Sequence, residues 1–489
     1  MNVEHFLEKN EVREITIFKQ LVLNHGVLSY KDMLDHLEVS KASLDNDLES
    51  ISARISLPIK QVDIQYDGLN IELTMSDHVS LQDIYRLYLD QSIKIKIINF
   101  LFRYQKFSIT QLTQKLAISE SSLFRKIREL NSYLKEFGLK IRNGQLNGEE
   151  LQIRYFYFQF YSYIEDKTQL FTLNPDSQMT QTIYSLENFL NVTIVPENRQ
   201  RLITWLIISK SRITIKNPKS KQLREQMKPY VKDPLYHKLQ VMLLRYFSRY
   251  SIEVDEVEAM LHFAFLLAFP ILTENDFHEY TLVRNRHAPV ASLNTYIAET
   301  IINHFKFRRL PYMLERAMYY HLTQIHTRLY FFYGDIEIYE YEDVLAKEKQ
   351  VVGDDLVAFA QELLATSIET FGIKAEGNNS LLKMGLFKYI NLLLLISLKM
   401  AKVLQIGIDL KMDGLYKETL SELLILKMRP MKGIQIGRYE SNKEYDLILT
   451  NKKPTDQGVY EGARVYVLSE VLSSFDLANI QRIIKELNT

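Results

Sequence analysis

The chain has 489 residues, of which 46% are hydrophobic and 25% charged, and its 60 basic residues balance 60 acidic ones. This length and composition predict a soluble globular protein of about three to five domains. Because the net charge is zero, attraction to nucleic acid has to come from local clusters of basic residues. The absence of cysteine excludes disulfides, thiolate nucleophiles and zinc–sulfur sites, and it suits a reducing, cytoplasmic location.

The sequence contains none of the common short catalytic motifs. It has no Gly-x-Gly-x-x-Gly, no phosphate-binding loop, no His-Glu-x-x-His and no Gly-x-Ser-x-Gly. The longest apolar stretches, FAFLLAFPIL and INLLLLISL, are shorter than the ~20 residues that span a bilayer. We therefore expect no enzymatic activity, no catalytic residue, no cofactor, no metal site and no membrane partner.

A duplicated unit fills the N-terminal part of the chain. A shift of 79 residues places SYKDMLDHLEVSKASLDNDLESI on SITQLTQKLAISESSLFRKIREL, and the apolar residues recur at helical spacing in both copies. Ser40 and Ser119 stand where the N-cap of the last helix belongs. A hairpin follows each copy, with tight turns predicted at Asp67-Gly68 and Asn147-Gly148. We predict two tandem winged helix-turn-helix modules, over residues 1–80 and 81–165.

The two copies differ in charge. Residues 12–62 contain six Lys/Arg and seven Asp/Glu, whereas residues 92–142 contain eleven and three. The last helix of the first copy carries Asp45, Asp47 and Glu49, which repel phosphates. In the second copy, the residue types on the last helix and the wing suit DNA, because arginine bridges guanine N7 and O6 while lysine and serine reach phosphates. The predicted DNA-binding residues are Ser121, Ser122, Arg125, Lys126, Arg128, Lys140 and Arg142.

Alternatives stay open for both modules. A basic helix face can be solvated without binding anything, and winged modules also bind proteins. We expect the second module to be the main DNA reader. The first module either adds a supporting DNA contact or has a structural or dimerising role.

The rest of the chain divides by its periodicity. From about residue 165 to 400 the apolar residues recur at helical period, and the polar stretch TENDFHEYTLVRNRHAPVAS separates two helical domains, residues 166–283 and 284–402. From about residue 403 strands alternate with helices, which predicts a small α/β domain with a parallel sheet over residues 403–489. The predicted fold is mainly α and multidomain.

This order of modules resembles the Mga/AtxA family of Gram-positive transcription regulators, which control virulence, over nearly the full length. The resemblance implies two helical phosphotransferase-regulation domains (PRDs), whose histidines accept phosphate from the sugar phosphotransferase system. The segments RAMYYHLTQIHTRLYF and EVEAMLHFAFLLA give His321 and His262 as candidate phosphorylation sites. The other two corresponding segments, RLITWLIISKSRI and LLKMGLFKYINLLLL, contain no histidine.

The resemblance also implies that the C-terminal domain is similar to the IIB component of sugar phosphotransferase systems. Active IIB proteins carry a cysteine after the first strand, and the corresponding loop here, DLKMDG, has none, which excludes cysteine phosphotransfer. In the family this domain supports dimer formation. The expected partners are double-stranded DNA, a second copy of the chain through the C-terminal domain, and phosphocarrier proteins of the sugar phosphotransferase system.

We therefore expect a cytoplasmic DNA-binding transcriptional regulator, an activator, that is tuned by phosphorylation of PRD histidines and by dimerisation. Two other classes are weighed against it. A phosphotransferase-type phosphocarrier is disfavoured by the missing cysteine and the incomplete histidine set. A protein-interaction scaffold, whose winged modules bind protein, remains open, and a histidine within an apolar helix is commonly a core residue.

Overall fold

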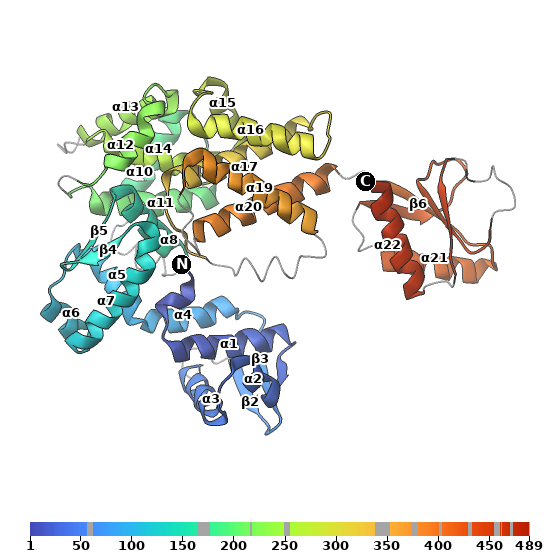
Figure 1. Cartoon of the computed structure of the whole chain (residues 1–489), viewed down its shortest axis with the longest axis horizontal. Helices are drawn as coiled ribbons and strands as arrows, with labels where there is room; N and C mark the ends of the chain where they lie inside the picture. Colours follow the sequence, from blue (N-terminus) through green and yellow to red (C-terminus); the bar gives the residue numbers. More distant parts are fainter. Residues whose placement is uncertain are drawn as a thin grey trace. The chain divides into compact units, whose positions relative to one another are not determined.

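The computed structural model of the chain has two compact units, residues 1–391 and 392–489. Helices predominate in the first unit and the second contains a small sheet (Figure 1), which confirms the mainly α, multidomain prediction at this level. The division into five domains with the boundaries given above stays a prediction. The structure describes residues 1–55, 62–163, 177–215, 218–248, 255–337, 353–373, 380–400, 403–428, 433–453, 460, 462–469 and 473–488.

The described residues of 1–75 form three α-helices and a three-stranded antiparallel sheet with strand order β1-β3-β2. The predicted turn at Asp67-Gly68 joins β2 to β3, and Gly68 has a φ of +97°. The Asp67 carboxylate accepts hydrogen bonds from the backbone N–H groups of Leu69 and Asn70, which fixes this turn. The elements are η1 (Val3–Phe6), α1 (Lys9–Leu23), β1 (Val27–Ser29), α2 (Tyr30–Leu37), α3 (Lys41–Ile55), β2 (Val62–Tyr66) and β3 (Asn70–Met75).

The second copy repeats this arrangement of helices. The backbone N–H groups of Ser43 and Ser122 donate to the hydroxyls of Ser40 and Ser119, at 3.3 and 3.2 Å, which confirms both predicted N-caps. The elements are α4 (Leu81–Gln91), α5 (Ile93–Tyr104), α6 (Ile109–Leu116), α7 (Glu120–Leu134), η2 (Lys135–Phe137), β4 (Lys140–Arg142) and β5 (Gln145–Asn147).

The predicted hairpin turn of the second copy was misplaced. The tight turn between β4 and β5 is Asn143-Gly144, with φ values of +52° and +71°, and not Asn147-Gly148. Gly144 also lies so close to Phe107 that a Cβ atom there would meet its carbonyl oxygen at 2.0 Å. Gly148 has a different reason to be glycine, because a Cβ atom there would lie 2.2 Å from the Leu139 side chain. Two Asn-Gly pairs occur in one short segment, and only packing distinguishes them.

Helices predominate in the rest of the first unit, and α20 continues past the unit's last residue, 391. One apolar core runs from the N-terminal helices into these helices. Three of them are joined by buried ion pairs, because Arg154 bonds Glu150 and Glu258 while Arg212 bonds Glu150. The helices are α8 (Glu150–Tyr163), α10 (Ser177–Leu190), α11 (Pro196–Arg212), α12 (Lys221–Met227), η3 (Lys228–Tyr230), α13 (Pro234–Ser248), α14 (Val257–Ala268), α15 (Glu274–Val283), α16 (Pro289–His304), α17 (Tyr312–Phe331), α19 (Asp354–Phe371) and α20 (Ser380–Met400).

Among the described helices, α20 alone is long and apolar enough to cross a bilayer by length and composition. It begins upstream of the INLLLLISL stretch, and 44% of its most apolar window is buried. The hydroxyl of Tyr389 on α20 hydrogen-bonds His326 on α17 and Ser367 on α19. A helix packed in a protein core passes the same test, so this feature is weak support for a membrane span.

The second unit is an α/β layer, as the alternating pattern predicts. Its four strands are all parallel, in the order β7-β6-β8-β9. Leu447, Ile448 and Leu449 of β8 are fully buried, since β8 lies inside the sheet. The elements are β6 (Leu404–Asp409), α21 (Gly414–Met428), β7 (Ile434–Arg438), β8 (Leu447–Thr450), β9 (Arg464–Val467) and α22 (Ser474–Asn488).

Candidate nucleic-acid interface

One face of α7 carries exposed cations. Arg125 and Arg128 are exposed, as is Ser121 one turn before Arg125, whereas Ser122 is half-buried. The spacing of four and then three residues places Ser121, Arg125 and Arg128 on one side of the helix. Leu123 is fully buried on the side that packs into the core. The apolar stripe that docks α7 therefore leaves these three side chains to the solvent.

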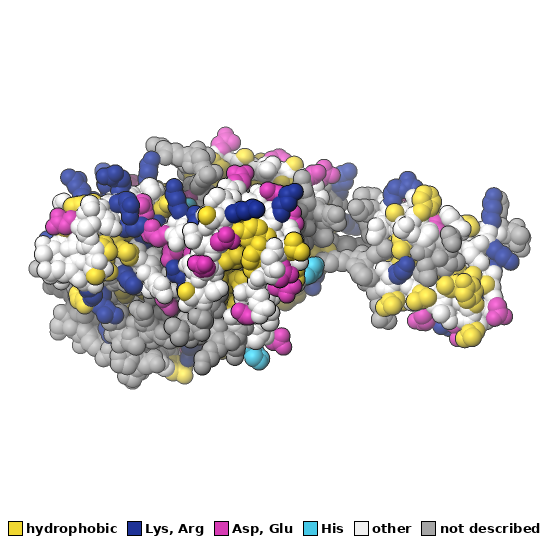
Figure 2. All heavy atoms as spheres, turned by 90° about the horizontal axis from the view of Figure 1, so that it is seen from below, with side chains coloured by type: hydrophobic (Ala, Val, Ile, Leu, Met, Phe, Trp, Pro, Cys, Tyr) yellow, Lys and Arg dark blue, Asp and Glu magenta, His cyan; other side chains and the backbone are white. Residues whose placement is uncertain are grey.

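These cations form no ion pair within the described part of the chain, although the charge of Arg125 acts on the Glu129 carboxylate four residues further along α7. Neither Arg125 nor Arg128 forms an ion pair there, and the same is true of Lys140 and Arg142, which are exposed on β4. Figure 2 shows Lys and Arg side chains gathered at the left of the view, the side on which α6 and α7 lie in Figure 1. Unpaired exposed cations on a helix and on the hairpin that follows it are available to the phosphates of a nucleic acid.

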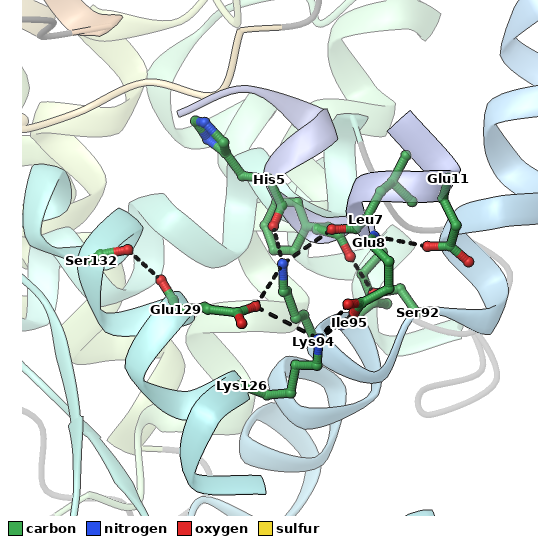
Figure 3. A network of polar contacts seen from close by, with 11 residues as sticks. His5, Leu7, Glu8, Glu11, Ser92, Lys94, Ile95, Lys126, Glu129 and Ser132 are labelled. Carbon is green, nitrogen blue, oxygen red and sulfur yellow. Dashed lines mark hydrogen bonds and ion pairs between the residues drawn. The ribbon is translucent and has the colours of Figure 1, made fainter. Parts of the chain in front are cut away.

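The prediction that Lys126 shares this exposed face was wrong. Its side chain is 3% exposed, and its ammonium group bonds both carboxylate oxygens of Glu8, the residue that precedes α1 (Figure 3). The Glu129 carboxylate lies 3.7 Å from the same nitrogen. Helical periodicity places Lys126 next to Arg125 but cannot reveal a partner 118 residues away in the sequence. Lys126 therefore links α7 to the segment before α1, and its side chain is not on the exposed face of α7.

Lys94 on α5 extends this junction. Its ammonium group donates to the backbone carbonyls of His5 and Leu7, at 2.9 and 3.1 Å, and lies 3.1 Å from the Glu129 carboxylate (Figure 3). Burial alone would raise the pKa of Glu129, but the hydrogen bond and charge of Lys94, together with the charges of Lys126 and Arg125, lower it below its ordinary value. We call Glu8, Lys94, Lys126 and Glu129 the junction cluster. It ties the segment before α1 to α5 and α7.

The first copy has a buried charge at the same position of its last helix. Asp47, which the repeat aligns with Lys126, accepts two hydrogen bonds from the guanidinium of Arg13 on α1, both at 2.9 Å. Asp45 and Glu49 remain exposed on α3. The exposed face of α3 is therefore acidic and that of α7 basic. Arg13 on α1 contacts Asp47 of α3, and Glu8, the residue before α1, contacts Lys126 of α7.

The basic face of α7 also carries a residue that the sequence prediction omitted. Phe124 is 50% exposed and lies three residues after Ser121 and next to Arg125. The core stripe of α7 follows Leu123, Ile127 and Leu130, and Phe124 falls outside it. This departure from the apolar spacing is the signal in the sequence that could have identified Phe124 as a surface residue.

The two candidate histidines lie in different surroundings. His262 on α14 is 3% exposed, and its Nδ1–H donates to the carbonyl of Glu258 at 2.8 Å. His321 on α17 is half-buried. Burial lowers the pKa of both rings below the ordinary value, and Lys388 lowers that of His321 further although Glu274 opposes it. Both imidazoles are thus neutral, the nucleophilic form, but only His321 has part of its surface open to a phosphate donor.

Comparison with known proteins assigns residues 77–161 to the Mga helix-turn-helix domain. The chain is 24% identical over 209 residues to the anthrax toxin expression trans-acting positive regulator of Bacillus anthracis, covering 42% of this chain and 43% of that protein. It is 23% identical over 190 residues to a trans-acting regulator of Streptococcus pneumoniae serotype 4, covering 37% and 38%.

A third relative is the capsule synthesis positive regulator AcpB of Bacillus anthracis, which is 26% identical over 145 residues, covering 29% of this chain and 30% of that protein. The matched stretches thus span less than half the length of each of these curated relatives. The matched domain contains α4 to α7, the β4–β5 hairpin and the exposed basic residues described above.

Proposed function

We propose that this chain belongs to the Mga/AtxA family. On that basis, we propose that it is a DNA-binding transcriptional regulator that activates its target genes. Two of the relatives have names that describe them as positive regulators. We also propose that the protein is cytoplasmic and has no enzymatic activity. Function is carried by the binding of duplex DNA and by the control of that binding.

The observation that carries this proposal is the basic face of α7. Arg125 and Arg128 are exposed, lie on one side of the helix and form no ion pair among the described residues. A helix of this kind fits the major groove, where arginine bonds guanine edges, while Lys140 and Arg142 on the hairpin reach the adjacent backbone. The acidic face of α3 makes the first copy unsuited to the same role, which favours a structural role for it.

Two finer proposals concern regulation. The C-terminal unit, read as a IIB-like domain, joins two copies of the chain, and phosphorylation of His321 by phosphocarrier proteins changes activity. His321 is favoured over His262 because its ring is partly accessible. A His321→Asp variant, which adds a negative charge, should change reporter output from a target promoter. Equal output from both proteins would leave His321 as a structural residue.

The test of DNA binding uses the full chain and a duplex selected from a random pool. The Arg125→Ala/Arg128→Ala variant should bind more weakly. Its log–log salt slope should be shallower than that of the wild type by about 0.9 for each of the two arginines that contacts a phosphate, whereas an arginine that bonds guanine changes the affinity more than the slope. Thermal unfolding should be unchanged, since both side chains are exposed. Fluorescence anisotropy at several salt concentrations measures both quantities.

A matched control variant removes two positive charges from another part of the surface. Lys232 and Lys238 are exposed near and on α13, and a Lys232→Ala/Lys238→Ala variant should keep the wild-type affinity and slope. Equal losses in the two double variants would mean that overall charge, and not α7, attracts DNA. Wild-type binding that is independent of salt would favour the protein-interaction scaffold.

A further inference from the structure

Phe124 has an unusual place on the surface of α7. Half of its side chain is exposed, and its ring has no aromatic or cationic partner among the residues that the structure describes. Spacings of three and four residues put it on the side of the helix that bears Ser121 and Arg128, whereas Arg125, the next residue in the chain, lies about 100° further around the helix. An aromatic ring is therefore held in water at the edge of the basic face, next to Arg128.

The folding of the helix does not account for this ring. A single exposed apolar residue is ordinary on a protein surface. Here, however, Leu123 and Leu130 already supply the buried stripe, both fully buried. The sister helix has Asp45 at the aligned position, and its carboxylate accepts a hydrogen bond from the Tyr30 hydroxyl at 2.6 Å. The repeat thus tolerates a polar residue at this position, and the basic copy has an aromatic one.

We infer that Phe124 is a specificity-determining residue that contacts the C5-methyl group of a thymine in the major groove. This inference rests on the proposed function. The thymine methyl is the apolar group that base edges present in that groove, and phenylalanine is one of the side chains that contact it. Contact removes both surfaces from water, while Arg128 and, further around the helix, Arg125 bond phosphates or guanine and fix the helix.

The geometry favours the major groove over insertion between base pairs. Apolar wedges that unstack bases act from the minor groove, whereas the major groove admits a whole helix. Phe124 is the fifth residue of α7, which has 15 residues, and it lies on the same side of the helix as Arg128. A helix that lies in the major groove on that face places the ring against base edges.

The experiment replaces thymine by deoxyuridine, which removes only the methyl group. Duplexes selected by the full-length wild-type chain are synthesised with one such replacement at a time. At one or more thymines, wild-type binding should weaken about three- to fivefold, the effect of exposing one methyl-sized group. Phe124→Ala should bind thymine and uracil duplexes equally, and Phe124→Leu should keep part of the difference.

Leu282→Ala is the control, because Leu282 on α15 is similarly exposed, at 57%. It should keep the full wild-type preference for thymine. The inference is overturned if no thymine shows a methyl effect, or if Phe124→Ala retains the effect, while salt-dependent binding of the duplex persists. Failure of the wild type to bind any duplex would instead overturn the proposed function, so the two failures are distinguishable.

Discussion

At the scale of single residues, His326 shows how strongly this core selects a protonation state. The ring is fully buried, with Nδ1 bonded to Asn294 and Nε2 bonded to Tyr389. The Asn294 contact is to a side-chain oxygen, so Nδ1 carries the proton and Nε2 accepts from the tyrosine. Burial lowers the pKa of His326 to about 3, so the folded protein holds this ring neutral.

Acid should therefore destabilise the protein through His326. Below the unfolded pKa of about 6.5 the unfolded chain binds a proton that the folded chain rejects, so stability falls as the pH falls. Between pH 7 and pH 5 this residue should account for about 2 kcal/mol of the lost unfolding free energy. Urea denaturation of the wild type and of His326→Gln at the two pH values measures the difference. Identical pH dependence in both proteins would contradict the expectation.

At the scale of elements, the sequence correctly predicted the helices and caps that depend on residues close together in the chain. The helices of both repeats and their serine caps follow from spacing and from one hydroxyl beside the first free N–H groups. The turn at Asn143-Gly144 was missed because Asn147-Gly148 has the same local chemistry. Lys126 was misassigned because its burial depends on Glu8, a contact across the fold that periodicity does not encode.

The junction cluster should contribute to stability more than exposed ion pairs do. Glu8→Gln leaves the buried Lys126 ammonium with only Glu129, 3.7 Å away, and should lower the unfolding free energy by about 1–2 kcal/mol. This loss of unfolding free energy is smaller than the loss for a fully buried ion pair, since Glu8 is 44% exposed. Urea denaturation measures the loss.

The matched variant for this comparison is Glu256→Gln. Its partner Arg224 is 39% exposed and Glu256 is 51% exposed, so losing this pair should cost at most about 1 kcal/mol. If both variants lost the same free energy, the burial of Lys126 would not be stabilising the junction.

At the scale of the whole molecule, the C-terminal unit leaves several apolar side chains of one helix exposed. Helix α21 of the C-terminal unit has Leu415, Leu423 and Leu426 on its surface, at 77%, 39% and 60% exposure. Their spacing of eight and three residues brings them onto one side of the helix. Such a stripe is a reasonable contact for a second copy of the chain, as the proposed dimer requires.

Charges placed on this stripe should separate the proposed dimer. The full chain with Leu415→Glu and Leu426→Glu should sediment as a monomer at concentrations where the wild type is a dimer, because each glutamate would be buried without a partner. A Leu282→Glu variant, on exposed α15 of the other unit, should remain dimeric. A dimer that survives the α21 changes would place the contact elsewhere.

The opposite charges at Asp47 and Lys126 also bear on how the two copies evolve. Gene conversion that wrote only the last helix of the second copy over that of the first would set a lysine beside Arg13, and the reverse exchange would set an aspartate beside Glu8. Either event buries like charges next to each other, which lowers the stability of the product. Selection for folding alone thus opposes homogenisation of the duplicated segments and leaves each free to diverge on its outer surface.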